Sequence, residues 1–352
     1  MRVLIVKMSA LGDVIHALPV LDYLARTVKG IEIDWVVEEA FKEILTGNPQ
    51  VSRLHLARFK SWRKKPFSLA TLREVNALSN TLKERQYDIV FDLQGNIKSG
   101  IVTRLTGSQR RYGFDRDGVR ESLNVCCTTN QIPLRREDQH VTDRSLRVVS
   151  VPFGKNYTGL PLRTDIYTSP EDDSAAEVFL ATLSDGLVFV MHHGTTWETK
   201  HWHQEGWIEL GKEFLELHPD ATILLSWSGD REHEGTKAIA AGIGRQARVL
   251  PKLSLKGFTA LLKKVDLMIG GDTGPIHMAA AVGTPTVSLF RATDGLRNGP
   301  RGELHRIIQS PLSCTKCLRR SCDRDLECRM SVQVSSMLQA CRELLDVSLP
   351  LP

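Results

Sequence analysis

Asp13 stands directly after Gly12, beyond the short apolar run 3–6 and at the start of an amphipathic pattern. A carboxylate in the first turn of a helix accepts hydrogen bonds from free backbone N–H groups and favours the positive end of the helix dipole. The same position, just past a buried strand, is where open α/β sheets bind their ligands. Asp13 is therefore expected to act either as a helix cap or as a carboxylate that takes part in chemistry.

A second group of polar residues follows the apolar run 267–269. The turn at this point contains Gly270, Gly271, Asp272, Thr273, Gly274 and Pro275. Free N–H groups at the start of the small apolar helix expected over 276–282 can bind phosphate, and Thr273 adds a hydroxyl. A capped helix alone would not explain the paired glycines together with His277. We expect a phosphate-binding turn here.

The segment 192–202, HHGTTWETKHW, follows a third apolar run. Thr195 and Thr196 offer hydroxyls to an anion, and Lys200 can neutralise a phosphate as a point charge. The histidines of this segment invite comparison with metal sites, but their spacing matches no standard zinc signature. An anion-binding loop is the stronger expectation.

Four cysteines lie close together towards the C-terminal end, at Cys314, Cys317, Cys322 and Cys328. The first two have the C-x2-C spacing of half a zinc site, whereas the last two are too widely spaced for the other half. Zinc ligands, a redox pair and chance are the three interpretations. Because the segment lies far in sequence from Asp13 and Lys200, any zinc here is expected to be structural.

The segment 58–67, RFKSWRKKPF, surrounds one tryptophan with lysines and arginines. Such a run of charge is often a plain solvated loop. It also suits the docking of an anion, and a tryptophan among basic side chains is typical of a membrane interface. The overall net charge of +5, from 46 basic and 41 acidic residues, is too small for a protein that coats nucleic acid.

These groups need strands and helices to position them. Buried parallel strands are expected over 3–6, 34–37, 89–93, 187–191, 222–227, 267–269 and 286–290. Helices are expected over 13–28, 69–85, 206–217, 232–241, 255–264 and 332–345. Strand–helix alternation in both halves predicts two doubly wound α/β domains, joined by a turn-rich linker over 152–173. Two domains also suit a chain of 352 residues.

Two common classes of nucleotide enzyme are not supported. The segment 242–247 has the glycines of a dinucleotide fingerprint, but it ends a helix and precedes a strand, the reverse of the required order. A P-loop motif is missing as well. No apolar run approaches the roughly 20 residues of a membrane span, and the N-terminal run is too short for a signal peptide. A cytoplasmic protein is expected.

Three motifs together resemble one family. They are KMSALGDVIHALPVL (7–21), TTWETK (195–200) and GGDTGPIHMAAAVGTPTVSLF (270–290). These motifs are similar to those of the family 9 glycosyltransferases, the ADP-heptose:lipopolysaccharide heptosyltransferases of the GT-B fold. MRVLIVK, DWVVEEAF, SWRKK and VRESL are most similar to the members that add the first heptose.

The resemblance implies an α/β protein of the GT-B fold, in which two doubly wound Rossmann-like domains face a deep cleft. Residues 1–160 are expected to form the acceptor-binding domain with the catalytic aspartate, and residues 171–330 the ADP-sugar-binding domain. Residues 331–352 are expected to form a C-terminal helix that packs back on the first domain. The resemblance also implies work on the cytoplasmic face of the inner membrane, as a peripheral protein against its anionic surface and without a nucleic-acid partner.

The implied reaction moves heptose from ADP-heptose to the Kdo of Kdo–lipid A in lipopolysaccharide inner-core biosynthesis, with inversion. Asp13 matches the family's general base, and Lys200 matches the lysine that contacts the donor phosphates. The other implied donor-binding residues are Thr195, Thr196, Glu232, Asp272, Thr273, Gly274 and His277. The implied acceptor-binding residues are Arg58, Lys60, Arg63, Lys64 and Arg120.

The resemblance implies no cofactor for the chemistry, because Lys200 and the helix N-terminus near Thr273 can stabilise the leaving ADP in place of a metal. Two alternatives stay open. One is a heptosyltransferase II that adds the second heptose, and the other is a nucleotide-sugar-binding protein without turnover. Asp13 argues against the second alternative, since a pure binding protein needs no base.

Overall fold

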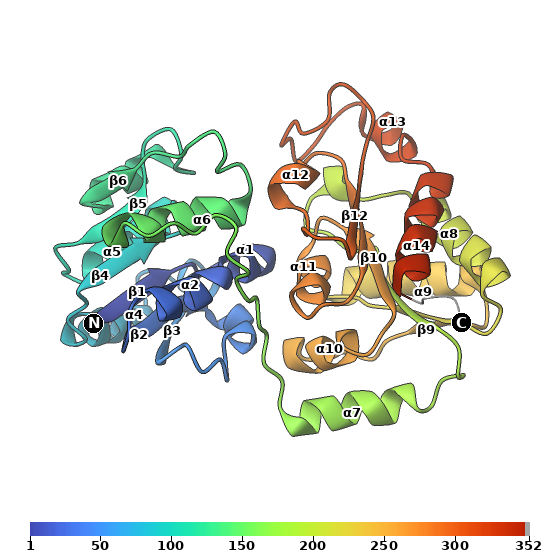
Figure 1. The fold of residues 1–352 in the computed structure, drawn as a ribbon, viewed down its shortest axis with the longest axis horizontal. Helices are drawn as coiled ribbons and strands as arrows, with labels where there is room; N and C mark the ends of the chain where they lie inside the picture. Colours follow the sequence, from blue (N-terminus) through green and yellow to red (C-terminus); the bar gives the residue numbers. More distant parts are fainter. Residues whose placement is uncertain (349–352) are drawn as a thin grey trace. The chain divides into compact units, whose positions relative to one another are not determined.

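The computed structural model describes residues 1–348 and divides into two compact units between Tyr167 and Thr168 (Figure 1). The division falls inside the linker expected over 152–173. Each unit carries one parallel sheet with helices packed on it, so the prediction of two doubly wound α/β domains is confirmed.

The first unit is built on six parallel strands in the order β3-β2-β1-β4-β5-β6. The strands are β1 (Arg2–Val6), β2 (Glu32–Glu38), β3 (Arg53–Ala57), β4 (Ile89–Asp92), β5 (Arg111–Phe114) and β6 (Asn130–Ile132). The helices are α1 (Leu11–Ala17), α2 (Pro19–Thr27), α3 (Phe59–Trp62), α4 (Leu69–Glu84), α5 (Ile97–Leu105) and α6 (Val141–Ser150), with 3₁₀ turns η1 (Glu39–Ile44), η2 (Ser122–Cys127) and η3 (Val151–Phe153). The strand order reverses between β1 and β4, and sheets of this kind bind ligands at the carboxyl ends of such neighbours.

The helix expected over 13–28 is two helices. α1 ends before Leu18, and Pro19 is the first residue of α2. Proline has no backbone N–H and its ring clashes with the preceding turn, whereas the first position of a new helix tolerates it. The break leaves Asp13 on a separate short helix directly behind β1.

The second unit repeats the same topology, with strands in the order β12-β11-β10-β7-β8-β9. The strands are β7 (Val188–His192), β8 (Thr222–Leu225), β9 (Ala247–Val249), β10 (Leu267–Gly271), β11 (Thr286–Phe290) and β12 (His305–Gln309). The helices are α7 (Pro170–Leu180), α8 (Gln204–Leu217), α9 (Asp230–Ile243), α10 (Leu255–Leu262), α11 (Gly274–Ala281), α12 (Gly295–Asn298), α13 (Asp325–Met330) and α14 (Val334–Ser348), with the 3₁₀ turn η4 (Glu198–Lys200). The switch point here lies between β7 and β10, which pair with Gly270 opposite His192.

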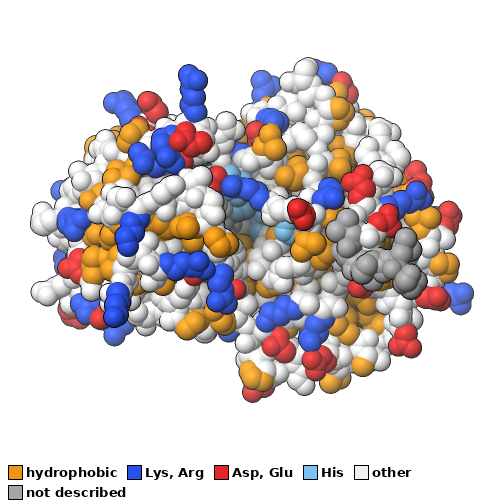
Figure 2. Space-filling view, in the orientation of Figure 1, with side chains coloured by type: hydrophobic (Ala, Val, Ile, Leu, Met, Phe, Trp, Pro, Cys, Tyr) orange, Lys and Arg blue, Asp and Glu red, His pale blue; other side chains and the backbone are white. Residues whose placement is uncertain are grey.

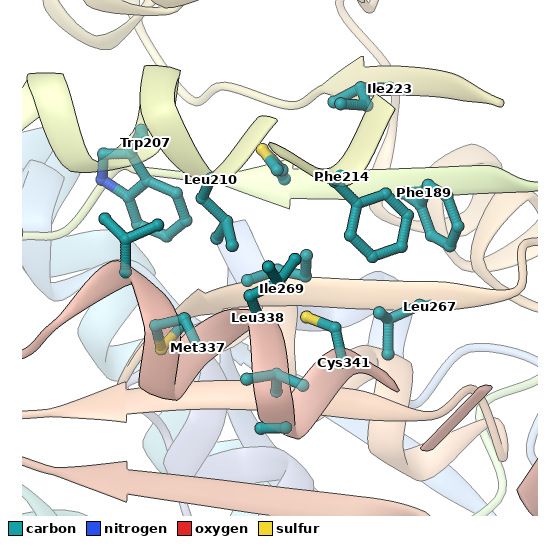
Figure 3. Close-up of a cluster of buried hydrophobic side chains, with 14 of the residues drawn as sticks. Phe189, Trp207, Leu210, Phe214, Ile223, Leu267, Ile269, Met337, Leu338 and Cys341 are labelled. Atoms are coloured by element: carbon teal, nitrogen blue, oxygen red, sulfur yellow. The ribbon is translucent and has the colours of Figure 1, made fainter. Parts of the chain in front are cut away.

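The expectation that residues 331–352 pack back on the first domain is wrong for their described part. Figure 3 shows Met337, Leu338 and Cys341 of α14 in one buried cluster with Leu267 and Ile269 of β10, in the core of the second unit. An amphipathic stripe buries itself on whichever apolar face its connection reaches, and α14 follows α13 and β12 of this same unit. Residues 349–352 lie outside the described part of the chain.

Across residues 1–348, the helices are too short or too polar to traverse a lipid bilayer.

Candidate active site

Asp13 is the third residue of α1 and reaches back to the start of its own helix. Its Oδ2 accepts a hydrogen bond from the backbone N–H of Ala10 at 3.1 Å. Ala10 occupies the N-cap position and has no side-chain oxygen, so the aspartate supplies one half of a capping box from inside the first turn. Asp13 therefore caps its helix as expected, but it does so from the third position of the helix and not from the N-cap position. The second oxygen, Oδ1, makes no hydrogen bond within residues 1–348.

The loop in front of Asp13 is held by a residue that the sequence reasoning missed. The side-chain oxygen of Gln94, buried after β4, accepts hydrogen bonds from the backbone N–H groups of Met8 at 3.0 Å and Ser9 at 3.1 Å. The carboxylate of Asp92 fixes Gln94 in turn by accepting from its backbone N–H at 3.0 Å. The sequence could have indicated Gln94, because this residue follows β4, the strand that pairs with β1, at its carboxyl end. The loop that leads into α1 and Asp13 is thus braced by the segment that follows the neighbouring strand β4.

In the second unit, the switch point brings Lys200 and Asp272 together. Lys200 follows β7 and Asp272 follows β10, and the Lys200 ammonium lies 2.7 Å from Oδ2 of Asp272. The hydroxyl of Thr293, which follows β11, donates to the same oxygen at 2.7 Å. Thr293 was also missed, although it too stands at the end of a strand of this sheet. Three neighbouring strands therefore converge on one carboxylate.

Asp272 is buried, and its charge is held in place from both sides. Oδ1 lies 3.3 Å from Nε2 of His277, one turn into α11. Burial raises the pKa of the Asp272 carboxyl, but the contact with His277 and the charge of Lys200 outweigh it and hold the pKa well below its usual range. The Asp272 carboxyl is therefore held in its ionised form beside the Lys200 ammonium.

The start of α11 offers donors to an anion. Thr273 is the N-cap residue of this helix, yet its side chain makes no capping hydrogen bond. Its hydroxyl oxygen is buried and has no hydrogen-bond partner among residues 1–348. An unpartnered buried hydroxyl beside free helix N–H groups and the Lys200 ammonium suits a phosphate oxygen. Gly274 continues this backbone without a side chain.

The loop with Thr195 and Thr196 meets the start of α9 through Gly194 and Glu232. A Cβ atom at position 194 would lie 2.4 Å from the Glu232 carboxyl carbon, so any other residue there would displace the Glu232 carboxylate. The backbone N–H of Ser228 donates to Glu232 Oε2 at 2.8 Å. Burial raises the pKa of Glu232. Glu232, one of the predicted donor-binding residues, thus lies against the predicted anion-binding loop.

The histidines of the 192–203 region have structural partners. His192 Nδ1 lies 2.9 Å from the Ser226 hydroxyl, and burial lowers the pKa of His192 to about 4. His193 Nε2 lies 3.0 Å from the Thr236 hydroxyl, and His203 caps α8 by accepting from the backbone N–H of Gly206 at 2.9 Å. These contacts account for His192, His193 and His203 without a metal.

The predicted acceptor-binding residues differ in how free their charges are. Arg58 pairs with Glu39 at 3.0 Å and with Glu74 at 3.5 Å. The other four members, Lys60, Arg63, Lys64 and Arg120, are exposed. On the face shown in Figure 2, Lys and Arg side chains are interspersed with Asp and Glu side chains.

The prediction that Trp62 lies at a membrane interface is wrong. The ring is buried in the core of the first unit, and its Nε1 donates to Glu74 Oε2 at 2.8 Å. The exposed aromatic residue of the segment is Phe67, which is 90% exposed.

The four cysteines do not form a zinc site. Cys314 and Cys317 are exposed, Cys322 and Cys328 are half-buried, and no group of three or more potential metal ligands comes together anywhere in residues 1–348. The C-x2-C half is not completed, because Cys322 and Cys328 lie too far apart along the chain to form the second half. The expectation of a structural zinc is therefore not supported.

Two parallel sheets of identical strand order, each with polar residues at its switch point, define a two-domain α/β protein of the nucleotide-binding type. The model of glycosyltransferase family 9 (heptosyltransferase) matches residues 75–326. The chain is 36% identical to lipopolysaccharide heptosyltransferase 1 of Pseudomonas aeruginosa, over 92% of this chain and 87% of the relative. The chain therefore belongs to glycosyltransferase family 9, as its motifs predicted.

Solved structures of the E. coli heptosyltransferase WaaC agree with this assignment. The structure with ADP has a TM-score of 0.78 and 30% identity, covering 98% of this chain and 100% of that one. The structure with ADP-2-deoxy-2-fluoro heptose has a TM-score of 0.72 and 31% identity, covering 90% of this chain and 98% of that one. The expected GT-B fold is confirmed.

Proposed function

We propose that this protein is an inverting heptosyltransferase that moves heptose from ADP-heptose to the Kdo of Kdo–lipid A, the first heptose transfer of the lipopolysaccharide inner core. Membership of family 9 and the similarity to lipopolysaccharide heptosyltransferase 1 support this reaction. The WaaC structures contain ADP and a fluorinated ADP-heptose, which supports an ADP-sugar as the donor. The alternative, transfer of the second heptose, has weaker support, because the E. coli ADP-heptose lps heptosyltransferase II is only 18% identical to this chain.

One observation in the structure carries the proposal. At the switch point of the second unit, the Lys200–Asp272 pair lies beside the N-terminus of α11, where the Thr273 hydroxyl is buried without a partner. A phosphate oxygen satisfies that hydroxyl and the helix N–H groups together. In the transition state the bond from the anomeric carbon to the phosphate oxygen breaks, and negative charge grows on the leaving ADP. Lys200 and the helix N-terminus stabilise that charge.

In the proposed mechanism Asp13 is the general base. Its Oδ1 oxygen takes the proton of the attacking Kdo hydroxyl, while the hydroxyl oxygen bonds to the anomeric carbon on the face opposite ADP. Displacement from the opposite face inverts the configuration, and a single carboxylate suffices for it. The hydrogen bond from Ala10 to Oδ2 fixes the orientation of the carboxylate and leaves Oδ1 for the proton.

The acceptor is anionic, and exposed cations of the first unit are proposed to bind it. Lys60, Arg63 and Lys64 lie around α3, and their charges suit the phosphates of lipid A and the carboxylate of Kdo. Phe67 projects from the same segment, in a turn closed by hydrogen bonds from Thr71 and Ser68 to the Lys65 carbonyl at 2.9 and 3.2 Å. An exposed aromatic ring among cations supports peripheral attachment to the anionic inner membrane, on its cytoplasmic face.

The test is release of ADP from ADP-heptose, measured without acceptor, with Kdo–lipid A, and with an acceptor that already carries the first heptose. The proposal predicts rapid release with Kdo–lipid A alone. Preference for the heptosylated acceptor would identify second-heptose transfer instead. Tight donor binding without release under any condition would identify a binding protein.

A further inference from the structure

The donor site described so far lacks positive charge. Lys200 is neutralised by Asp272 at 2.7 Å, and Glu232 adds a further carboxylate nearby. The N-terminus of α11 contributes only about half an elementary charge. The diphosphate of a nucleotide sugar carries a negative charge on each phosphate, so the site as predicted does not balance its ligand.

Trp197 connects this site to a second cation. The Lys200 ammonium lies 4.9 Å from the centre of the Trp197 ring, and the Arg320 guanidinium lies 5.0 Å from the same centre. Both distances are within the range of cation–π attraction. One indole ring therefore contacts both Lys200 and Arg320, although these residues are far apart in sequence.

The segment that carries Arg320 is anchored to the Lys200 loop. The Thr199 hydroxyl donates to the Arg319 carbonyl at 2.6 Å. The guanidinium of Arg291, which is buried, donates to the His201 carbonyl and lies 2.7 Å from a carboxylate oxygen of Asp325. These bonds tie both ends of the segment around Arg320 to the loop after β7. These hydrogen bonds and this ion pair therefore fix the backbone on both sides of Arg320.

Two cations of the segment, Arg319 and Arg320, form no ion pair among residues 1–348, and of these two Arg320 is the one over the Trp197 ring. Lys316 pairs with Asp294 at 3.1 Å, and Arg324 pairs with Glu327 at 2.7 Å. Arg320 is exposed and makes no ion pair with a carboxylate among residues 1–348. Its guanidinium can give two parallel hydrogen bonds to one phosphate, which an ammonium cannot.

We propose that Arg320 is a donor-binding residue that, across Trp197 from Lys200, binds the diphosphate of the nucleotide sugar. This inference rests on the proposed function and extends its donor site to the cysteine-bearing segment 314–328. The segment then has a role without metal, as the support that presents a second cation to the donor.

The test is calorimetric binding of ADP and of adenosine to the full-length protein and to Arg320→Gln. The inference predicts that Arg320→Gln weakens ADP binding about tenfold, the scale of one charge-assisted hydrogen bond, and leaves adenosine binding unchanged. Arg319→Gln is the matched control, because the backbone carbonyl of Arg319 contacts the site loop while its side chain is also exposed. Arg320→Lys should recover part of the lost affinity.

Each other outcome has a definite reading. If the unaltered protein and Arg320→Gln bound ADP with the same affinity, the proposed role of Arg320 would be overturned and the donor site itself would stand. Equal weakening in Arg319→Gln and Arg320→Gln would reduce the effect to general surface charge and also overturn it. If the unaltered protein bound no ADP, the proposed function would fall, and this inference with it.

Discussion

The Lys200 ammonium lies 2.7 Å from the buried Oδ2 of Asp272, which links the chemistry of the donor site to the stability of the second unit. Lys200, which we propose to bind the donor phosphates, is also the counter-ion of a buried carboxylate. Any substitution of Lys200 therefore changes two properties at once. Experiments on this site need variants that separate them.

The first prediction separates these two properties. Lys200→Met should lower the free energy of unfolding by up to about 3 kcal/mol, because Asp272 loses its cation while buried. It should also weaken ADP binding at least tenfold. The double variant Lys200→Met with Asp272→Asn should recover most of the stability, as measured by urea unfolding, and none of the ADP affinity. Recovered affinity in the double variant would mean that Lys200 serves only to neutralise Asp272.

The second prediction concerns the acceptor side. Arg63→Glu with Lys64→Glu should raise the KM for Kdo–lipid A at low salt and leave the KM for ADP-heptose unchanged. The effect should shrink with added salt, because exposed charges are screened over about 10 Å at 0.1 M. Lys212→Glu with Arg245→Glu is the control, with the same change of charge at exposed positions of the second unit. Matching acceptor kinetics for the two double variants would make the segment an ordinary solvated loop.

The third prediction concerns pH. Burial lowers the pKa of His192 to about 4, below the unfolded value near 6.5, so the unfolded chain binds more protons between these values. The contribution of the neutral, buried His192 to the free energy of unfolding is therefore complete above pH 6.5 and is lost as the pH falls towards 4. Between pH 7.5 and 5, the free energy of unfolding should fall by about 2 kcal/mol more in the unaltered protein than in His192→Asn. An equal fall in both proteins would show that His192 takes up its proton in the folded protein as readily as in the unfolded chain.

The sequence predicts well what depends on local pattern and strand ends. Lys200 and Asp272 each follow an apolar run, and parallel strands place their carboxyl ends together, so their meeting at β7 and β10 follows from topology. Thr293 and Gln94 also follow the carboxyl ends of strands, so the same rule could have predicted them from the sequence.

Other features depend on contacts that no local pattern contains. Trp62 stands among cations in the sequence, yet a hydrogen bond to Glu74 and the packing of the first unit bury it. The stripe of α14 reveals that the helix is buried, but not against which unit. Arg320 reaches Trp197 across more than a hundred residues through the anchoring of a loop, which spacing does not encode.

The central claim, that Asp13 is the base of heptosyl transfer, is tested most directly by the turnover of Asp13→Asn with ADP-heptose and Kdo–lipid A. Asparagine keeps an oxygen that can accept the Ala10 hydrogen bond but cannot take a proton. We expect Asp13→Asn to keep its melting temperature and its ADP binding and to lose roughly 10²–10⁴ in kcat. Asp13→Ala, the control for capping, should lose the same activity and also about 1 kcal/mol of stability. Near-normal turnover by Asp13→Asn, with lost stability in Asp13→Ala, would reduce Asp13 to a helix cap and contradict the account.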